Sequence, residues 1–217
     1  FIGQPTRIFA YLFHALFVDY RLWIESAWTL SSTLTAFVLA SIAGIVCGLL
    51  FALYPAAEKF FDPLFTALNA MPRIALAPLF LLWFGLGLPS KIALGFSLTF
   101  FIVVTNTVAG ARSVDPDFII LSRTLGASKT TIFFKVTLIS AVPTIFSGLR
   151  LGLIYALLGV IAGEIIAAEH GVGQLLAYLS GTFQTNGVFA VLIFLAVLGV
   201  ALTKLMNMFE NHLLRWQ

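Results

Sequence analysis

The only long polar interruption in this apolar chain is residues 114–150, which read VDPDFIILSRTLGASKTTIFFKVTLISAVPTIFSGLR. Its start carries the signals of a helix. The Asp115 side chain can accept hydrogen bonds from the free amides of a first turn, Pro116 fits the first helical position, and Asp117 complements the helix dipole there. The stretch therefore predicts a short helix that begins at Pro116.

A glycine divides the same stretch in two. Gly126 can adopt the left-handed conformation that ends the first helix about three turns after its start. Ser128 can then cap a second helix that extends through Phe133 and Phe134. We therefore expect two short helices joined at Gly126 rather than a disordered loop.

The composition around this stretch is that of a membrane protein. Of the 217 residues, 60% are hydrophobic and 10% are charged, and the mean hydropathy is +1.05, whereas a soluble domain carries about 25% charged residues. The net charge of +3 comes from scattered cations rather than from a basic stripe, which excludes a nucleic-acid partner. The partner that this composition predicts is the lipid bilayer.

The sequence holds no catalytic or metal-binding constellation. Its single cysteine, Cys47, lies in an apolar run and is expected to be a small buried hydrophobic residue, and no spacing typical of metal ligands occurs. The three histidines, His14, His170 and His212, are far apart in the chain. Residues 126–130 lack two glycines of a phosphate-binding loop, so we expect no ATP hydrolysis by this chain alone.

Five stretches predict membrane spans, since a helix needs about 20 apolar residues to cross a bilayer. One of them is short and broken, because Pro78 and Pro89 interrupt the 17 uncharged residues between Arg73 and Lys91. A pathway-lining helix that begins at Leu64 and a kinked scaffold helix both agree with this pattern. We expect the spans near residues 28–54, 74–90, 92–111, 143–168 and 188–204.

Two other segments are expected at the membrane surface. Residues 1–26 alternate apolar and polar side chains at helical spacing and predict an interfacial amphipathic segment, which precedes a transmembrane domain at 27–217. Residues 170–187 predict a re-entrant or surface helix on the outer side. The chain begins at Phe1 without a methionine, which predicts a processed or trimmed start.

Two polar side chains inside the expected spans are candidates for a solute pathway. Asn106 lies near the end of one span, where interhelical packing explains it as well as solute contact does. Glu164 is the only acid within a span, and a carboxylate there is costly unless it faces a cavity or hydrogen-bonds a neighbouring helix. Alternatively, Glu164 and Glu169 mark the outer interface, where an acid can reach water.

Pairs of glycines four residues apart occur in two of the expected spans. Such pairs let another helix approach closely. We expect part of one of these glycine faces to pack the two copies of a dimer, either at Gly44 and Gly48 in the first span or at Gly148, Gly152, Gly159 and Gly163 in the fourth. Alternatively, Gly44 and Gly48 occur by chance, since glycine is common in membrane helices.

Residues 113–137, called the polar loop from here on, resemble the cytoplasmic "EAA" loop of permeases in binding-protein-dependent ABC importers, and within these the nitrate/sulfonate/taurine subfamily. The resemblance rests on Gly126, Ala127, Ser128, Ile132, Phe133, Lys135, Val136, Leu138, Pro143, Gly148, Leu149 and Arg150, and in the Pro-rich span on Met71, Pro72, Pro78, Leu79, Phe80, Trp83, Phe84 and Gly85. The loop departs from the family pattern where Ile120-Leu121-Ser122 stands for Glu-Ala-Ala and Ile139 for a proline. We therefore expect a more apolar docking surface.

This resemblance implies an all-α, polytopic membrane protein with the type I ABC importer permease fold, of whose six spans the first is expected to be missing here. It implies a place in the bacterial cytoplasmic (inner) membrane and a pathway for a small solute of nitrate, sulfonate or taurine, bicarbonate or vitamin-precursor type. The implied partners are ABC ATPase subunits, a second permease copy in a homodimer and an external solute-binding protein. ATP and Mg²⁺ would be bound by the ATPase partner, and this chain would bind no cofactor.

The polar loop would couple the permease to the ATPase through Leu121, Ser122, Arg123, Leu125, Gly126, Ala127, Ser128 and Lys129. The candidates for the translocation pathway are Glu164, Asn106, Pro72 and Pro78.

The distribution of cations favours a cytoplasmic polar loop. In that orientation the positive-inside rule is obeyed, since the outer segments hold only Arg7, Arg21 and Lys91 and the inner ones hold Lys59, Arg73, Arg112, Arg123, Lys129, Lys135, Arg150, Lys204 and Arg215. The alternative function is a secondary transporter or channel without a separate ATPase, for which paired intramembrane charges or an inverted repeat would be expected. The sequence shows neither. A membrane-embedded scaffold subunit would not need the capped pair of helices.

Overall fold

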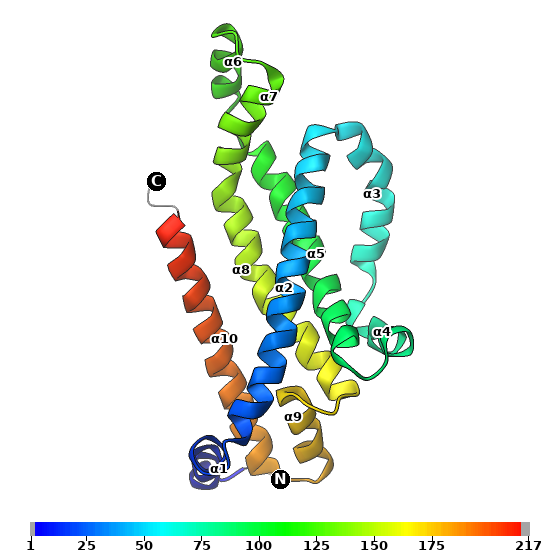
Figure 1. The fold of residues 1–217 in the computed structure, drawn as a ribbon, viewed down its shortest axis with the longest axis vertical. Helices are drawn as coiled ribbons and strands as arrows, with labels where there is room; N and C mark the ends of the chain where they lie inside the picture. The colour runs from blue at the N-terminus through cyan, green and yellow to red at the C-terminus, as the bar shows by residue number, and fades with distance from the viewer. Residues whose placement is uncertain (1–2, 214–217) are drawn as a thin grey trace.

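The chain forms an elongated bundle of helices in the computed structural model, which describes residues 3–213 (Figure 1). All regular structure in that range is helical, which confirms the predicted all-α class. The helices are α1 (Pro5–Phe17), α2 (Arg21–Leu53), α3 (Pro55–Ala70), the 3₁₀ helix η1 (Arg73–Leu76), α4 (Ala77–Phe84), α5 (Leu88–Arg112), α6 (Pro116–Thr124), α7 (Lys129–Ile132), the π-helical segment η2 (Phe133–Thr137), α8 (Leu138–Ile166), α9 (Val172–Gly181) and α10 (Thr185–Leu213).

Four helices are long and apolar enough to cross a bilayer, and a fifth crossing results if a bent pair is counted as one span. The four are Arg21–Leu53, Leu88–Arg112, Lys129–Ile166 and Thr185–Leu213. The bent pair joins α3 to η1 and α4 and turns by 86°. The predicted count of five spans, with the second one broken, agrees with this arrangement.

The broken span begins earlier than predicted. α3 starts at Pro55, directly after α2, rather than at Leu64. The break falls at Met71, whose backbone is extended because the following Pro72 disfavours the helical conformation. Pro89 does not interrupt a span, since it lies in the first turn of α5, where the missing amide has no helical partner to lose.

The prediction of a separate short helix after Gly126 is wrong. α7, η2 and α8 follow one another without a gap, so that one helix of 38 residues runs from Lys129 to Ile166. Pro143 lies inside α8 and does not begin a span. Prolines are tolerated inside membrane helices, because neighbouring groups and local adjustments of the helix satisfy the freed backbone carbonyl. α2 also begins earlier than predicted, and α10 extends beyond its predicted bounds at both ends. The prediction counted apolar residues only, so it left out the helical turns that carry polar side chains.

Glycines allow α2 and α8 to pack closely against α5. A Cβ atom at Gly48 would lie 2.6 Å from the Thr107 Cβ, and one at Gly148 would lie 2.5 Å from the Asn106 Cβ. Side chains at these positions would collide, so the glycines permit close approach of helices within one chain. The prediction that the glycine faces around Gly48 and Gly152 pack a dimer is therefore wrong, because α5 of the same chain already occupies them.

The two ends of the bundle are built differently (Figure 1). α6 and the start of α7 project from one end, whereas α1 and α9 close the other around a small core of Ala15, Leu22, Val172, Leu175, Leu179 and Val191. α9 is the predicted short helix of residues 170–187. α1 is amphipathic as predicted, although residues 21–26 belong to α2; the division into a segment 1–26 and a domain 27–217 stays a prediction.

Candidate functional site

The first helix of the polar loop begins and ends where the sequence signals predict. The Asp115 carboxylate accepts a hydrogen bond from the Asp117 amide at 2.9 Å. At the other end Gly126 has a φ of +81°, and the Ala127 amide donates to the Ser122 carbonyl at 3.0 Å. This pattern of bonds closes the helix at a left-handed residue.

The helix that follows begins at the predicted serine cap. The Ser128 hydroxyl oxygen accepts from the Thr131 amide at 3.2 Å, and the two hydroxyl oxygens lie 2.9 Å apart. Since the left-handed Gly126 lies two residues before Ser128, the chain reverses within a few residues and α6 and α7 form a compact tip (Figure 1).

Several large apolar side chains of the polar loop are exposed at its surface. Leu125 is 78% exposed, and Phe118, Ile120, Leu121 and Phe134 are each more than half exposed. Apolar side chains gathered on a projecting tip mark a surface that contacts another protein. The expectation of an apolar surface at Ile120 and Leu121 agrees with this exposure.

The other residues of the predicted coupling surface divide into two groups. Arg123 and Lys129 are exposed and place positive charge beside the apolar surface. Ser122 and Ala127 are half-buried and bonded to each other through their backbones. The loop therefore combines a fixed backbone with a free apolar and cationic surface, which suits it to docking.

Glu164 lies in a buried junction at the opposite end of the bundle. Its side chain is 1% exposed. The Thr29 hydroxyl of α2 and the Gly173 amide of α9 both donate to its Oε2 atom, each at 2.9 Å. Of the two environments that the sequence left open for an acid within a span, the hydrogen bond to a neighbouring helix is the one that the structure shows.

Sequence reasoning missed the side chains that complete this outer junction, which consists of Glu25, Thr29, Lys91, Glu164 and residues 170–173. The Glu25 carboxylate accepts from the Gly171 amide at 2.7 Å, and the Thr29 hydroxyl oxygen accepts from the Val172 amide at 2.9 Å. The Lys91 ammonium, which is 4% exposed, donates to the His170 carbonyl at 2.8 Å. The available signal was the spacing of Glu25 and Thr29 by four residues at the outer end of a span.

The remaining pathway candidates lie in separate surroundings. The Asn106 amide donates to the Ile102 carbonyl of its own helix at 2.8 Å and packs on Gly148, so it belongs to the interface of α5 and α8. Pro72 lies at the bend of the broken span and lines a cavity there, and Pro78 lies in the first turn of α4. A role of these residues in the solute pathway stays a prediction.

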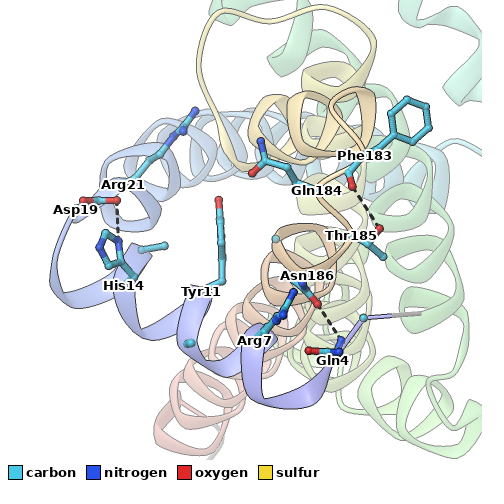
Figure 2. A pocket seen from close by; sticks show the side chains of 14 residues that line it. Gln4, Arg7, Tyr11, His14, Asp19, Arg21, Phe183, Gln184, Thr185 and Asn186 are labelled. Carbon is cyan, nitrogen blue, oxygen red and sulfur yellow. Dashed lines mark hydrogen bonds and ion pairs between the residues drawn. The ribbon is translucent and has the colours of Figure 1, made fainter. Parts of the chain in front are cut away.

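A polar pocket lies between α1 and the turn that joins α9 to α10 (Figure 2). His14 pairs with Asp19 at 3.0 Å, and the side-chain oxygen of Asn186 accepts from the Gln4 amide at 2.9 Å. Tyr11 points into the pocket, and burial raises the pKa of its hydroxyl above the ordinary value, so the hydroxyl stays protonated at neutral pH. The hydrogen bond from Gln4 to Asn186 thus ties the start of α1 to the start of α10, and the hydrogen bond between His14 and Asp19 fixes the turn between α1 and α2.

The same architecture occurs in known transport proteins. Residues 37–215 match the family described as the binding-protein-dependent transport system inner membrane component. The formylaminopyrimidine transport permease protein ThiX of Halalkalibacterium halodurans is 34% identical over 87% of this chain and 76% of its own length. The taurine transport system permease protein TauC of Escherichia coli is 31% identical over 92% of this chain and 73% of its own length.

The fold is also similar to a solved structure. A chain of the MetNI methionine ABC transporter in an inward-facing conformation superposes with a TM-score of 0.73 at 19% identity, over 85% of this chain and 92% of that chain. At this identity the likeness establishes the fold alone.

The fold and the polar loop define a membrane-spanning component of a transport system. The chain belongs to the family of binding-protein-dependent transport system inner membrane components. It is a multi-pass permease subunit of an ABC importer in the inner membrane, and it functions in a complex with ATPase and binding-protein partners. The chain is not itself an enzyme, since ATP hydrolysis belongs to the ATPase subunit.

Proposed function

We propose that this permease works as a homodimer with two ATPase subunits and carries a small solute that an external binding protein delivers. The solute would be of the kinds named for its relatives, among them taurine and formylaminopyrimidine. ATP and Mg²⁺ would be bound by the ATPase subunits, and this chain would need no cofactor of its own.

The observation that carries this proposal is the tip of the polar loop. Residues 121–129 include the exposed Leu121, Leu125, Arg123 and Lys129 on a backbone that two caps and Gly126 hold in one shape. A preformed apolar surface of this kind docks with little loss of conformational entropy. The ATPase groove would receive Leu125 at its centre.

The broken span is the proposed wall of the solute pathway. Irregular backbone at membrane depth is tolerated where it lines a cavity, and the bend beside Pro72 lines one. Pro78 would fix the start of α4 on the far side of the bend. Asn106 and Glu164 would support this wall by holding α5 and α8 in place rather than by touching solute.

A charge substitution at the tip tests the docking surface. The permease carrying Leu125→Asp should lose co-purification with its ATPase subunits, because a carboxylate in an apolar groove is left without solvent or partner. Phe183→Asp is the matched control, since Phe183 is 84% exposed at the opposite end of the bundle. Retention of the ATPase by the Leu125→Asp permease would contradict the proposal.

Reconstitution separates this function from the alternative. Proteoliposomes with permease, ATPase and binding protein should take up solute only with ATP, and native mass spectrometry should find two permease chains for each complex. Uptake that an ion gradient drives without the ATPase would identify a secondary transporter or channel instead.

A further inference from the structure

A cavity of about 380 Å³ lies where the broken span bends. The bend cavity is lined by Asn69, Met71, Pro72, Arg73, Ile74, Leu98, Ile102 and Tyr155, which come from α3, the bend, η1, α5 and α8. It holds one cation, two further hydrogen-bonding side chains and five apolar ones. None of its lining side chains is acidic.

The Arg73 guanidinium is fixed in place without a carboxylate. Its Nη1 atom donates to the carbonyl oxygens of Ser97 and Leu98 on α5, at 3.2 and 3.4 Å. Nη2 donates to the Asn69 side-chain oxygen. The carbon at the centre of the guanidinium lies 4.3 Å from the centroid of the Phe101 ring. These neutral partners orient the group, but its positive charge stays uncompensated.

This charge lies deep in the membrane-spanning part of the chain. On helical rise, Ser97 is about 14 Å along α5 from Leu88 and about 22 Å from Arg112, so the carbonyls that hold Arg73 lie near the middle of that span. The sequence-based assignment of Arg73 to the inner loops is therefore wrong. A cation at such depth is costly and faces a cavity or pathway when it is retained.

The ion pairs found among residues 3–213 leave Arg73 out. They join His14 to Asp19, Arg112 to Glu58 and Arg150 to Glu210. The bend cavity thus offers an oriented guanidinium whose counter-ion is not supplied by the part of the chain that the structure describes.

The other walls of the cavity fit an organic anion. The Asn69 amide nitrogen can donate while its oxygen accepts from Arg73, and the half-exposed Tyr155 can donate through its hydroxyl from α8. Four of the five guanidinium N–H groups are used inside the chain, since Nε also donates to the Leu68 carbonyl at 3.4 Å. One N–H of Nη2 is left to donate to an oxyanion, and such a charge-assisted hydrogen bond is stronger than a neutral one. The side chains of Met71, Leu98 and Ile102 present an apolar wall to a short carbon chain.

We propose that the bend cavity binds the oxyanion group of the transported solute, with Arg73 as its counter-charge and Asn69 and Tyr155 as further donors. This inference rests on the proposed function and narrows it to solutes that carry a sulfonate or a similar oxyanion. Asn69 also lines a second cavity between α3 and α5, whose lining includes Glu58, Asp62 and Arg112.

Binding of a fluorinated sulfonate to the purified permease–ATPase complex tests the proposal. The ¹⁹F resonance of trifluoromethanesulfonate should broaden with the wild-type complex, and trifluoroethanol, a neutral probe, should broaden far less. Arg73→Gln should weaken sulfonate binding by roughly tenfold or more, since hydrogen bonds to charged groups are the strong ones. The affinity of Arg73→Lys should fall between those of the wild type and Arg73→Gln, because lysine keeps the charge and loses the set of hydrogen bonds that orients the guanidinium.

Two further variants guard against a purely structural effect of Arg73. Tyr155→Phe removes only a cavity hydroxyl and should weaken sulfonate binding a few-fold without changing trifluoroethanol binding. Lys59→Gln removes an exposed positive charge from α3, the helix on the other side of the bend from Arg73, and should leave sulfonate binding unchanged. If the Arg73→Gln complex does not assemble, the proposal is tested by the other two variants: Tyr155→Phe should weaken sulfonate binding and Lys59→Gln should not.

Sulfonate binding that Arg73→Gln and Tyr155→Phe leave unchanged would overturn the proposal, as would equal broadening of the neutral probe. ATP-dependent uptake is measured on the same preparations. A wild-type complex that lacks such uptake but binds sulfonate through Arg73 would contradict the proposed function and not the anion site.

Discussion

The Thr29 hydroxyl donates to the Glu164 carboxylate at 2.9 Å, and 135 residues of chain separate the two. The bond joins α2 to α8 at the outer end of the bundle, where both side chains are fully buried. Since the same carboxylate also receives the Gly173 amide, one acid fixes three helices relative to one another. The Glu164 carboxylate should therefore contribute to the stability of the permease.

Removing this carboxylate should destabilise the permease. Glu164→Ala leaves the Gly173 amide unpaired at a cost of about 1–3 kcal/mol and also leaves a cavity, whereas Glu164→Gln keeps one accepting oxygen and should cost less. The reaction of the single, half-buried Cys47 with a thiol-reactive dye during heating reports unfolding. Equal unfolding temperatures for wild type, Gln and Ala would contradict a structural role of Glu164.

Gly171 should tolerate no side chain while Glu164 is present. Its φ is +121°, and a Cβ atom there would lie 2.2 Å from the Glu164 carboxyl group. Gly171→Ala should therefore combine backbone strain with a collision. In a double-mutant cycle, Glu164→Ala should relieve the collision and leave the strain, so the two effects should be non-additive; additive losses of stability would show that the two residues do not contact.

The turn at Gly126 should govern coupling to the ATPase. Gly126→Val places a β-branched residue at a φ of +81°, which costs about 1–2 kcal/mol and should abolish stimulated ATPase activity without preventing membrane insertion. Gly126→Asn is the control, because asparagine tolerates the left-handed conformation. Full transport by the Gly126→Val complex would contradict this prediction.

The glycine faces should act within one chain. Gly48→Ala and Gly148→Ala should each lower stability by about 1–3 kcal/mol, since each added methyl group meets α5 at 2.6 Å or less. Gly199→Ala serves as the comparison, because no heavy atom lies within 4 Å of a Cβ at that position of α10. Normal monomer stability combined with loss of the dimer would reverse this assignment.

The local signals of the polar loop were readable from the sequence. Asp115, Gly126 and Ser128 act on amides or φ angles within a few residues of themselves, so their roles in capping and turning follow from residue type and spacing. The end of the second helix was misjudged, because Pro143 is a weaker stop signal inside a long apolar helix than it is in water.

Contacts between distant segments were not readable in this way. Glu164 is surrounded by apolar residues in its own helix, and its partners Thr29 and Gly173 come from elements that only the fold brings near. Arg73 lies next to Pro72 in a stretch that resembles a turn, and nothing in its neighbours reveals that Ser97 and Leu98 hold it near the middle of a span. Lys91 and Glu25 were missed for the same reason.

The uninterrupted helix from Lys129 to Ile166 is a mechanical lever. Its 38 residues span about 57 Å, with the docking tip at one end and the acid of the outer junction one turn from the other. A tilt of about 5° about the tip would displace the far end by about 5 Å, on that length. Under the proposed docking, motion of the ATPase at the cytoplasmic face would displace the outer end of this helix sideways, and η2, with its wider turn, would be the place where the helix bends.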